Sequence, residues 1–384
     1  MHLTKNQEKI LNGEEGKGKK KAMKILAALG SIYNADGMIE ITSAHVSGVS
    51  YKTIGDAGLE FLKDFAADEN VKVSVKTTLN PCGMDLKNWR DQGIPEYFAE
   101  KQLEIMNAFS SMGFEESYTC VPYLTGNRPN FKDHIAWGES SAVCFANSMI
   151  GARTNREGGP GALSAAILGI TPNYGLHLDE NRIANVCVNV NAKVKDIYDY
   201  SALGYLVSKK IGAEIPYFKK INPDTDCAKA LCAALATGSV AMFQIENVTP
   251  ENNYDISDEI SINDNDLNEF KSQLNKGDFE LIATGCPHCS LSEIKAISKL
   301  LKNKKINKEF WVCTSRKIKK QAEALGYVKI IENSGAKIVC DTCMVVTPVE
   351  EIVDSVATNS GKATYYLPNL CKVKTVFNRL DKLI

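Results

Sequence analysis

The stretch from about residue 270 to residue 384 constrains the fold most, because strand-like and helix-like segments alternate there without interruption. A strand, helix, strand, helix, strand order predicts parallel strands joined by right-handed crossovers. Ser290 and Glu293 form a capping box that marks the start of the first helix. The segments in order are FELIATG, SLSEIKAISKLLKNK, EFWVCTS, RKIKKQAEALGY and AKIVCDTCMVV, followed by an expected loop, ATNSGKATYY.

Parallel strands place the loops that follow them at one edge of a sheet, and α/β proteins bind ligands at this edge. We therefore expect Cys286, Ser315, Cys340 and Ser360 to gather along one edge. Two earlier strands, MIEITSAH and VKVSVKTTLN, also run into loops of small and polar residues. The acidic stretch from residue 251 to 267 is predicted to be a boundary or surface excursion before the last lobe.

Charge and hydropathy exclude several classes of protein. The chain has 45 Lys and Arg against 46 Asp and Glu, so no basic footprint for nucleic acid is present. The charged N-terminus lacks the apolar core of a signal peptide, and the run from Gly161 to Ile170 is too short to span a bilayer. We expect a cytoplasmic protein whose partner is a small molecule or another protein.

Twelve cysteines are a high number for a cytoplasmic chain, in which disulfides are the exception. Some are explained by burial, because free cysteine is among the most buried residue types. The cysteines that lie in apolar or small-residue segments are Cys144, Cys187, Cys227, Cys232 and Cys313.

Two CxxC pairs, Cys286/Cys289 and Cys340/Cys343, permit three readings. A four-thiolate zinc site is one, although 50 residues lie between the pairs and zinc ribbons have about 15–20. A thioredoxin-like dithiol is another, since CPHC stands between a strand and a helix. The third is an iron–sulfur cluster held by three thiolates with one iron open, and Cys120 or Cys82 would then be a third ligand.

Several motifs stand along nearly the whole chain, namely HVSGVSYKTIGDAG, TTLNPCGMD, TCVPYLTGNRP, WGESSAVCFANSMIGARTNREGGPGAL, TPNYGLH, GCPHCS, CDTCMVV and NSGKATYYLP. Taken together, they resemble the catalytic chain of the aconitase X family. This resemblance implies an aconitase-like α/β fold in which several doubly wound lobes with parallel sheets surround a central cleft. It covers residues 1–384 as the catalytic region and implies that a swivel-type small domain is on a separate chain.

The implied activity is that of a hydro-lyase. Resemblance to the split members of the family, in which the small domain is a separate chain, implies dehydration of (R)-5-phosphomevalonate to trans-anhydromevalonate 5-phosphate in a modified mevalonate route. Fused members imply dehydration of cis-3-hydroxy-L-proline, which stays an alternative. A cysteine-rich metal sensor or scaffold is an alternative of another class, but it needs no shaped substrate loops.

The resemblance also implies site residues. It assigns an iron–sulfur cluster to Cys120, Cys286 and Cys340, and makes Cys289 and Cys343 supporting residues. We expect a [4Fe-4S] cluster, although three cysteines can also hold a smaller cluster or a single iron. The resemblance leaves this chain without a general base, which in the family is a serine of the small domain. We expect anion-binding groups in the loops around these cysteines, namely Gly48, Val49, Ser50, Asn80, Pro81, Arg153, Arg156, Ser360 and Lys362. His45 and His288 lie beside these loops and are weak candidates for donors to the leaving oxygen.

Overall fold

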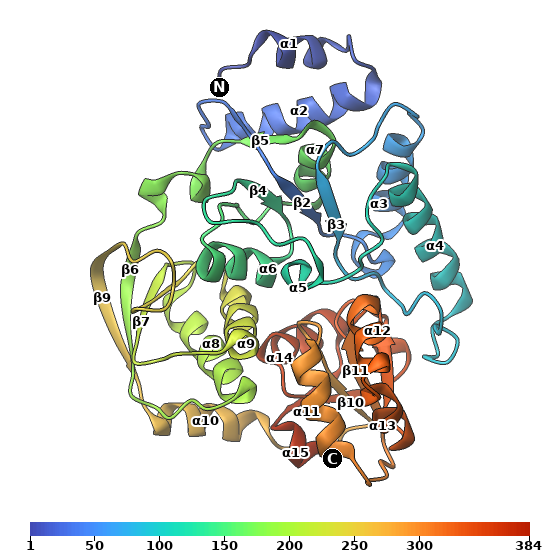
Figure 1. The fold of residues 1–384 in the computed structure, drawn as a ribbon, viewed down its shortest axis with the longest axis vertical. Helices are drawn as coiled ribbons and strands as arrows, with labels where there is room; N and C mark the ends of the chain where they lie inside the picture. The colour runs from blue at the N-terminus through green and yellow to red at the C-terminus, as the bar shows by residue number, and fades with distance from the viewer.

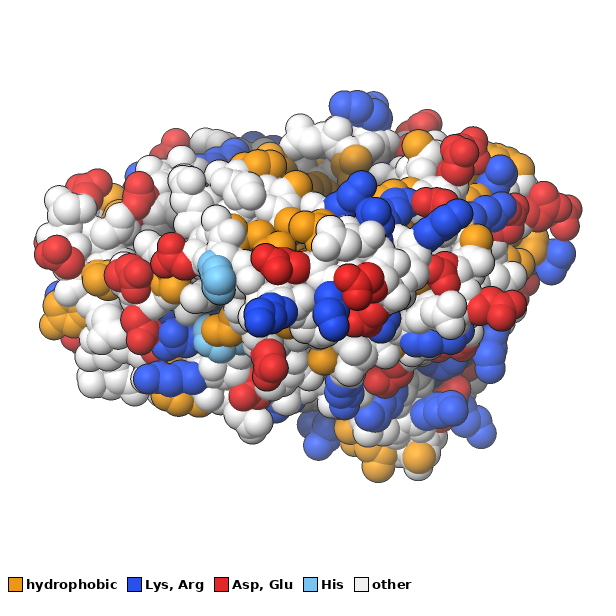
Figure 2. All heavy atoms as spheres, turned by 90° about the horizontal axis from the view of Figure 1, so that it is seen from above, with side chains coloured by type: hydrophobic (Ala, Val, Ile, Leu, Met, Phe, Trp, Pro, Cys, Tyr) orange, Lys and Arg blue, Asp and Glu red, His pale blue; other side chains and the backbone are white.

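The computed structural model describes residues 1–384 and contains three parallel sheets, each formed by a separate part of the chain (Figure 1). These sheets confirm the predicted α/β class. None of the helices combines the length and the apolar character needed to cross a membrane. On the face shown in Figure 2, acidic and basic side chains are interspersed, and no broad area carries a single sign of charge.

The N-terminal sheet has the strand order β3-β2-β4, and both pairings are parallel. Its central strand is buried along its whole length, because helices cover the sheet and contribute to one apolar cluster. The elements of this part are α1 (Lys5–Asn12), α2 (Lys17–Ile32), β1 (Met38–Glu40), β2 (Ser43–Val46), α3 (Tyr51–Ala66), β3 (Lys76–Leu79), α4 (Glu96–Ser111), α5 (Pro122–Thr125), β4 (Ile135–Trp137), α6 (Ser140–Phe145), η1 (Ala146–Ile150), α7 (Gly159–Leu168) and β5 (Ile170–Pro172).

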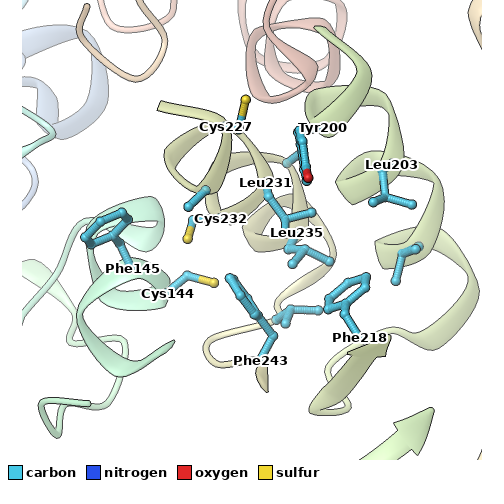
Figure 3. Close-up of a cluster of buried hydrophobic side chains, with 14 of the residues drawn as sticks. Cys144, Phe145, Tyr200, Leu203, Phe218, Cys227, Leu231, Cys232, Leu235 and Phe243 are labelled. Carbon is cyan, nitrogen blue, oxygen red and sulfur yellow. The ribbon is translucent and has the colours of Figure 1, made fainter. Parts of the chain in front are cut away.

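The middle sheet has the order β8-β7-β6-β9, again with parallel pairs. Helices α8 and α9 bury their apolar residues against α6 and the sheet, and Cys144, Cys227 and Cys232 lie in this core as predicted (Figure 3). The elements are η2 (Gly175–His177), η3 (Asp179–Asn181), β6 (Ala184–Val190), α8 (Ile197–Ile211), β7 (Pro216–Lys219), α9 (Thr225–Leu235), η4 (Ala236–Gly238), β8 (Gln244–Ile245), β9 (Tyr254–Ile262) and α10 (Asp264–Leu274).

The acidic stretch is regular structure, which differs from the predicted surface excursion. Strand β9 pairs with β6 at the edge of the middle sheet, and most of its side chains are exposed. An edge strand that faces water tolerates charged residues, which also discourage pairing with other chains. The sequence pattern therefore failed to predict this strand, because its exposed residues are charged.

The C-terminal sheet has five parallel strands in the order β12-β11-β10-β13-β14. The predicted third strand ends at Cys340, and the expected loop after it contains a strand and a helix capped by Ser360. The elements are β10 (Leu281–Thr284), α11 (Leu291–Leu301), β11 (Glu309–Thr314), α12 (Arg316–Ala324), α13 (Tyr327–Asn333), β12 (Lys337–Cys340), η5 (Val349–Glu351), β13 (Ser355–Thr358), α14 (Gly361–Tyr366), η6 (Leu367–Cys371), β14 (Lys374–Phe377) and α15 (Leu380–Leu383).

The carboxyl ends of the N-terminal and C-terminal sheets meet. The Ser50 hydroxyl donates to the Val346 carbonyl at 2.7 Å, and the Cys82 amide donates to the Asp341 carbonyl at 2.9 Å. In the C-terminal sheet, the strand order reverses between β10 and β13, and ligands bind at such a switch point. Loops that follow strands of both sheets therefore surround one space.

Candidate active site

A cavity of about 280 Å³ lies where these loops meet. Gly48, Val49, Ser50, Asn80 and Pro81 line it from the N-terminal part, as expected. A larger cavity of about 400 Å³ lies between the middle and C-terminal parts and contains none of the predicted site residues. The smaller cavity is therefore the candidate active site. Its remaining lining residues are Ser47, Thr53, Cys120, Gly138, Glu139, Ser140, Arg156, Cys286, Cys343, Val345, Val346, Lys362, Tyr366 and Leu370.

Three thiols from three loops face this cavity. They belong to Cys120, Cys286 and Cys343, each at most 6% exposed. A hydrogen bond from the Cys286 thiol lowers the pKa of Cys343 to about 7, against the effect of burial, and the thiolate is the form of cysteine that binds metals. All twelve cysteines are free thiols.

Cys340 differs from the expectation, because it does not line the cavity. It is the last residue of β12, its amide donates to Asp85 at 2.9 Å, and its side chain packs in a core cluster with Cys289. Asp341, at φ 65°, turns the chain immediately afterwards, so that Cys343 reaches the cavity instead. Each CxxC pair thus has one cysteine at the cavity and one in the core.

The two pairs accordingly do not converge as four zinc ligands. No group of three His, Cys, Asp or Glu side chains lies close enough to hold a single metal ion. Thiolates that bind different irons of one cluster are spaced more widely than ligands of one ion. This donor set therefore fits a cluster with three cysteine ligands better than one zinc ion.

His288 joins the three cysteine loops and is not placed for acid–base chemistry. Its amide donates to Cys120 Sγ at 3.2 Å, and its ring nitrogens lie 3.2 Å from Thr119 Oγ1 and 2.9 Å from the Thr342 carbonyl. A carbonyl only accepts, so Nε2 carries the proton and Nδ1 accepts from Thr119. Burial lowers the pKa of His288 to about 4, and both nitrogens of the neutral ring are occupied.

The loop after β2 offers unused amides to the cavity. Gly48 has φ 78°, and the N–H groups of Gly48, Val49 and Ser50 have no hydrogen-bond acceptor in the chain. Consecutive free amides form an anion-binding concavity. The loop after β3 differs from the expectation, because the Asn80 amide donates to Val46 and Pro81 has no N–H, so only the Asn80 side chain is offered.

Lys362 lines the cavity as an ion pair with Glu139, a residue that the sequence analysis missed. Burial would raise the pKa of Glu139, but Lys362 and hydrogen bonds from Ser141 and Ala142 lower it to about 2. Glu139 stands two residues after the end of β4, so the strand-end pattern used for other loops would have found it. Ser360 differs from the expectation, because its hydroxyl caps α14 and donates to the Cys286 carbonyl outside the cavity.

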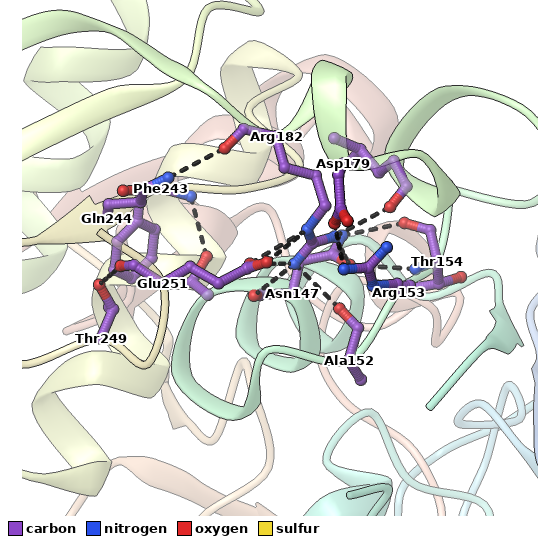
Figure 4. Close-up of polar contacts among 12 residues, drawn as sticks. Asn147, Ala152, Arg153, Thr154, Asp179, Arg182, Phe243, Gln244, Thr249 and Glu251 are labelled. Carbon is purple, nitrogen blue, oxygen red and sulfur yellow. Dashed lines mark hydrogen bonds and ion pairs between the residues drawn. The ribbon is translucent and has the colours of Figure 1, made fainter. Parts of the chain in front are cut away.

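The two arginines of the predicted basic loop have different environments. Arg156 is exposed at the cavity, with no hydrogen-bond or ion-pair partner in the chain. Arg153 is 7% exposed and, contrary to the expectation, is bonded to Asp179 and to the His177 carbonyl (Figure 4). Arg153 does not line the cavity, and its main chain forms an isolated β-bridge with His134. Only Arg156 is available to a ligand.

His45 lies behind the cavity rather than in its lining, because it belongs to the fully buried strand β2. Burial lowers the pKa of His45 to about 4. His45 is therefore not part of the cavity lining. The lining combines three thiols, a row of free amides, an exposed arginine and a buried lysine–glutamate pair.

Family models cover this arrangement in three consecutive parts. They are described as the aconitase X first domain over residues 1–180, the second domain over 184–272 and the third domain over 279–384. The chain belongs to the aconitase X family. Membership confirms the resemblance that the sequence motifs indicated.

Individual relatives agree with this membership. The chain is 52% identical over 401 residues to the phosphomevalonate dehydratase large subunit of Methanocaldococcus jannaschii, covering 100% of this chain and 99% of that protein. It is 34% identical to cis-3-hydroxy-L-proline dehydratase of Pseudomonas aeruginosa, covering 94% of this chain and 65% of that protein. The crystal structure of Thermococcus kodakaraensis aconitase X in its holo-form has a TM-score of 0.93 and 48% identity, covering 100% of this chain and 99% of that one.

Proposed function

We propose that this chain is the large subunit of a hydro-lyase that dehydrates (R)-5-phosphomevalonate to trans-anhydromevalonate 5-phosphate. The observation that carries the proposal is the cavity in which three thiols face unused amides and a free arginine. The 52% identity to a phosphomevalonate dehydratase large subunit over nearly the full length of both chains supports this substrate. The hydroxyproline alternative is supported only at 34% identity.

The proposed cofactor is an iron–sulfur cluster, [4Fe-4S], held by Cys120, Cys286 and Cys343. The three thiols come from different loops and are buried, and the low pKa of Cys343 favours its thiolate. Three cysteine ligands leave one iron without a protein ligand. The chemistry that such a cluster supplies when bound is Lewis acidity toward the departing hydroxyl group.

The residues of this chain bind and orient the substrate anion. The amides of Gly48, Val49 and Ser50 and the guanidinium of Arg156 are donors without partners, so they gain a hydrogen bond when an anionic oxygen enters. Lys362 adds a positive charge, although Glu139 balances it. A substrate with two anionic groups, one phosphate and one carboxylate, matches these two groups of donors, the amides and the guanidinium.

The general base is proposed to come from a second chain. The acidic side chain in the cavity lining is Glu139, and its salt bridge and pKa of about 2 make it a weak base. A swivel-type small subunit that completes the cavity, in a heterodimer, would supply this group. The proposed location is the cytoplasm, where reducing conditions preserve the twelve free thiols.

The test is anaerobic co-purification of the chain with its small subunit, quantification of iron and sulfide, and assay with both candidate substrates. Iron with sulfide and turnover of (R)-5-phosphomevalonate is the expected result. Turnover of cis-3-hydroxy-L-proline alone would replace the substrate and retain the hydro-lyase class. Zinc without sulfide, and no turnover of either compound, would refute the proposal.

A further inference from the structure

Two buried polar atoms at the back of the cavity have no hydrogen-bond partner. They are Nε2 of His45, whose side chain is 0% exposed, and Oδ1 of Asn80, a residue of the cavity lining. The two residues are neighbours on adjacent strands, because His45 pairs with Thr78, two residues before Asn80, and the Asn80 amide donates to the carbonyl of Val46. Unpaired buried polar groups are rare and costly, so such a pair calls for an explanation.

The neighbours of His45 determine which of its nitrogens carries the proton. Asn127 Nδ2 donates to Thr78 Oγ1 at 2.9 Å, and Thr78 Oγ1 lies 2.8 Å from His45 Nδ1. The hydroxyl accepts from the Asn127 amide and has no other acceptor in the chain for its own proton, which therefore goes to Nδ1. In a neutral ring the proton is then on Nε2, the nitrogen that has no partner. His45 is neutral, since burial holds its pKa near 4.

The hydrogen-bonding groups of the Asn80 side chain complement the N–H group of His45. Its Oδ1 is an acceptor without a donor, whereas its Nδ2 makes no hydrogen bond in the chain and is not among the enclosed unpartnered atoms. An amide whose oxygen is held from behind presents its N–H groups to the cavity. An amide free to rotate presents its oxygen for part of the time, and that oxygen repels an anion.

We propose that His45 is a positioning residue whose Nε2–H holds the Asn80 side-chain carbonyl, so that the Asn80 amide donates to the anionic substrate. This inference rests on the proposed function, because it assigns an anion to the same cavity. The connection runs from Asn127 through Thr78 and His45 to Asn80, and joins the N-terminal sheet to the cavity. His45 itself does not contact the substrate.

The environment of His45 excludes a simpler acid–base role. The ring lies outside the cavity lining, its edge faces Trp137 at a centroid distance of 5.9 Å, and the nearby charged group is Glu139. A proton on Nε2 would have to pass the Asn80 amide to reach a substrate. An effect of His45 on turnover must therefore act through Asn80.

A double-mutant cycle tests this dependence in the reconstituted holoenzyme. His45→Phe, Asn80→Ala and the double variant are compared with the wild type for kcat, KM, iron content and thermal midpoint. Each single variant is expected to lower kcat/KM about tenfold, mainly through KM, with unchanged iron. The double variant is expected to match the single ones, because His45 has nothing to position once the amide is gone.

Further variants separate positioning from folding. His45→Gln retains an N–H donor and is expected to recover much of the lost kcat/KM, whereas Thr78→Val removes the partner of Nδ1 and is expected to lower it. His134→Phe, a partly buried histidine outside the cavity, is the matched control. If His45→Phe does not fold, the cycle is run with Thr78→Val and Asn80→Ala.

The same four proteins are also compared by calorimetry for their binding of inorganic phosphate and acetate, which requires no turnover. If the wild type does not dehydrate phosphomevalonate but His45→Phe weakens anion binding only when Asn80 is present, the proposed function fails and the positioning role stands. Additive losses in the cycle, or loss of iron in His45→Phe, would overturn the positioning role.

Discussion

At the residue scale, each CxxC pair divides its cysteines between two environments. Cys286 and Cys343 face the cavity, whereas Cys289 and Cys340 pack in the apolar cluster under α11 and α12. The motif alone treats both cysteines of a pair as equivalent. The residues that follow each strand decide which of them is exposed to a ligand.

Replacing each cysteine of the second pair by serine, in separate variants, tests this division. Cys343→Ser is expected to lose most of its bound iron and sulfide, because a serine hydroxyl replaces a proposed ligand. Cys340→Ser is the matched control and is expected to retain both, at a cost of about 1–3 kcal/mol in stability from a buried hydroxyl. Iron and sulfide per chain, with the visible absorption spectrum, decide between them. Equal loss in both variants would contradict the assignment.

A buried histidine makes the protein sensitive to acid. Burial, with the nearby His134, Arg182 and Arg153, lowers the pKa of His177 from 6.5 to about 3. The unfolded chain binds a proton below pH 6.5 that the folded chain binds only near pH 3. Stability from this group is therefore complete above pH 6.5 and falls as the pH drops toward 3, by up to about 1.4 kcal/mol per unit.

The expected result is that His177→Gln flattens the decline of the thermal midpoint between pH 7 and pH 5. Removing the group removes its proton uptake on unfolding, so the wild type should lose more stability than the variant over this range. His2→Gln, at an exposed position, serves as the control. Parallel curves for His177→Gln and the wild type would contradict the assignment.

At the scale of elements, one arginine connects the N-terminal and middle parts (Figure 4). Arg182 follows η3, its side chain is 1% exposed, and its Nε lies 3.0 Å from both oxygens of Glu251. It also donates to the carbonyls of Asn147, Ala152 and Leu176. One side chain thus satisfies acceptors on three separate segments of the chain.

Arg182→Met is expected to destabilise the protein by about 3–5 kcal/mol, because Glu251 becomes a buried charge without a partner. Arg90→Met breaks an ion pair with Glu96 in which both side chains are 72% exposed, and little change is expected there. Urea unfolding followed by circular dichroism provides the comparison. Similar losses of unfolding free energy in the two variants would contradict the larger cost expected for breaking the buried Arg182 ion pair.

At the scale of the whole molecule, the cavity belongs to two sheets that are distant in sequence. The amides after β2 and the lysine of α14 are separated by about 300 residues, as the Ser50–Val346 bond illustrates with its separation of 296. The cavity offers donors and thiols but a poor base. Its chemistry is thus incomplete within this chain under the proposed function.

The isolated chain, reconstituted with iron and sulfide, is expected to turn over phosphomevalonate at least roughly a hundredfold more slowly than the complex with the small subunit, since a positioned general base contributes about 10²–10⁴. Dehydration rates at equal iron content provide the measurement. Equal rates with and without the second chain would place the base in this chain.

The sequence by itself determined the α/β class, because hydrophobic runs, caps and strand-end loops are local patterns that survive without tertiary context. It also placed most of the cavity loops, since a residue directly after a parallel strand has little choice of edge. The strand β9 escaped because its outward face is charged.

Only the tertiary structure decided which side chain of each loop is free. Arg153, Ser360 and Cys340 lie in predicted loops, but Asp179, the Cys286 carbonyl and a core cluster take up their side chains. Their partners are far away in sequence or on other elements, and no local pattern records them. A spacing determines where the chain goes, whereas long-range pairing determines which groups remain for a ligand.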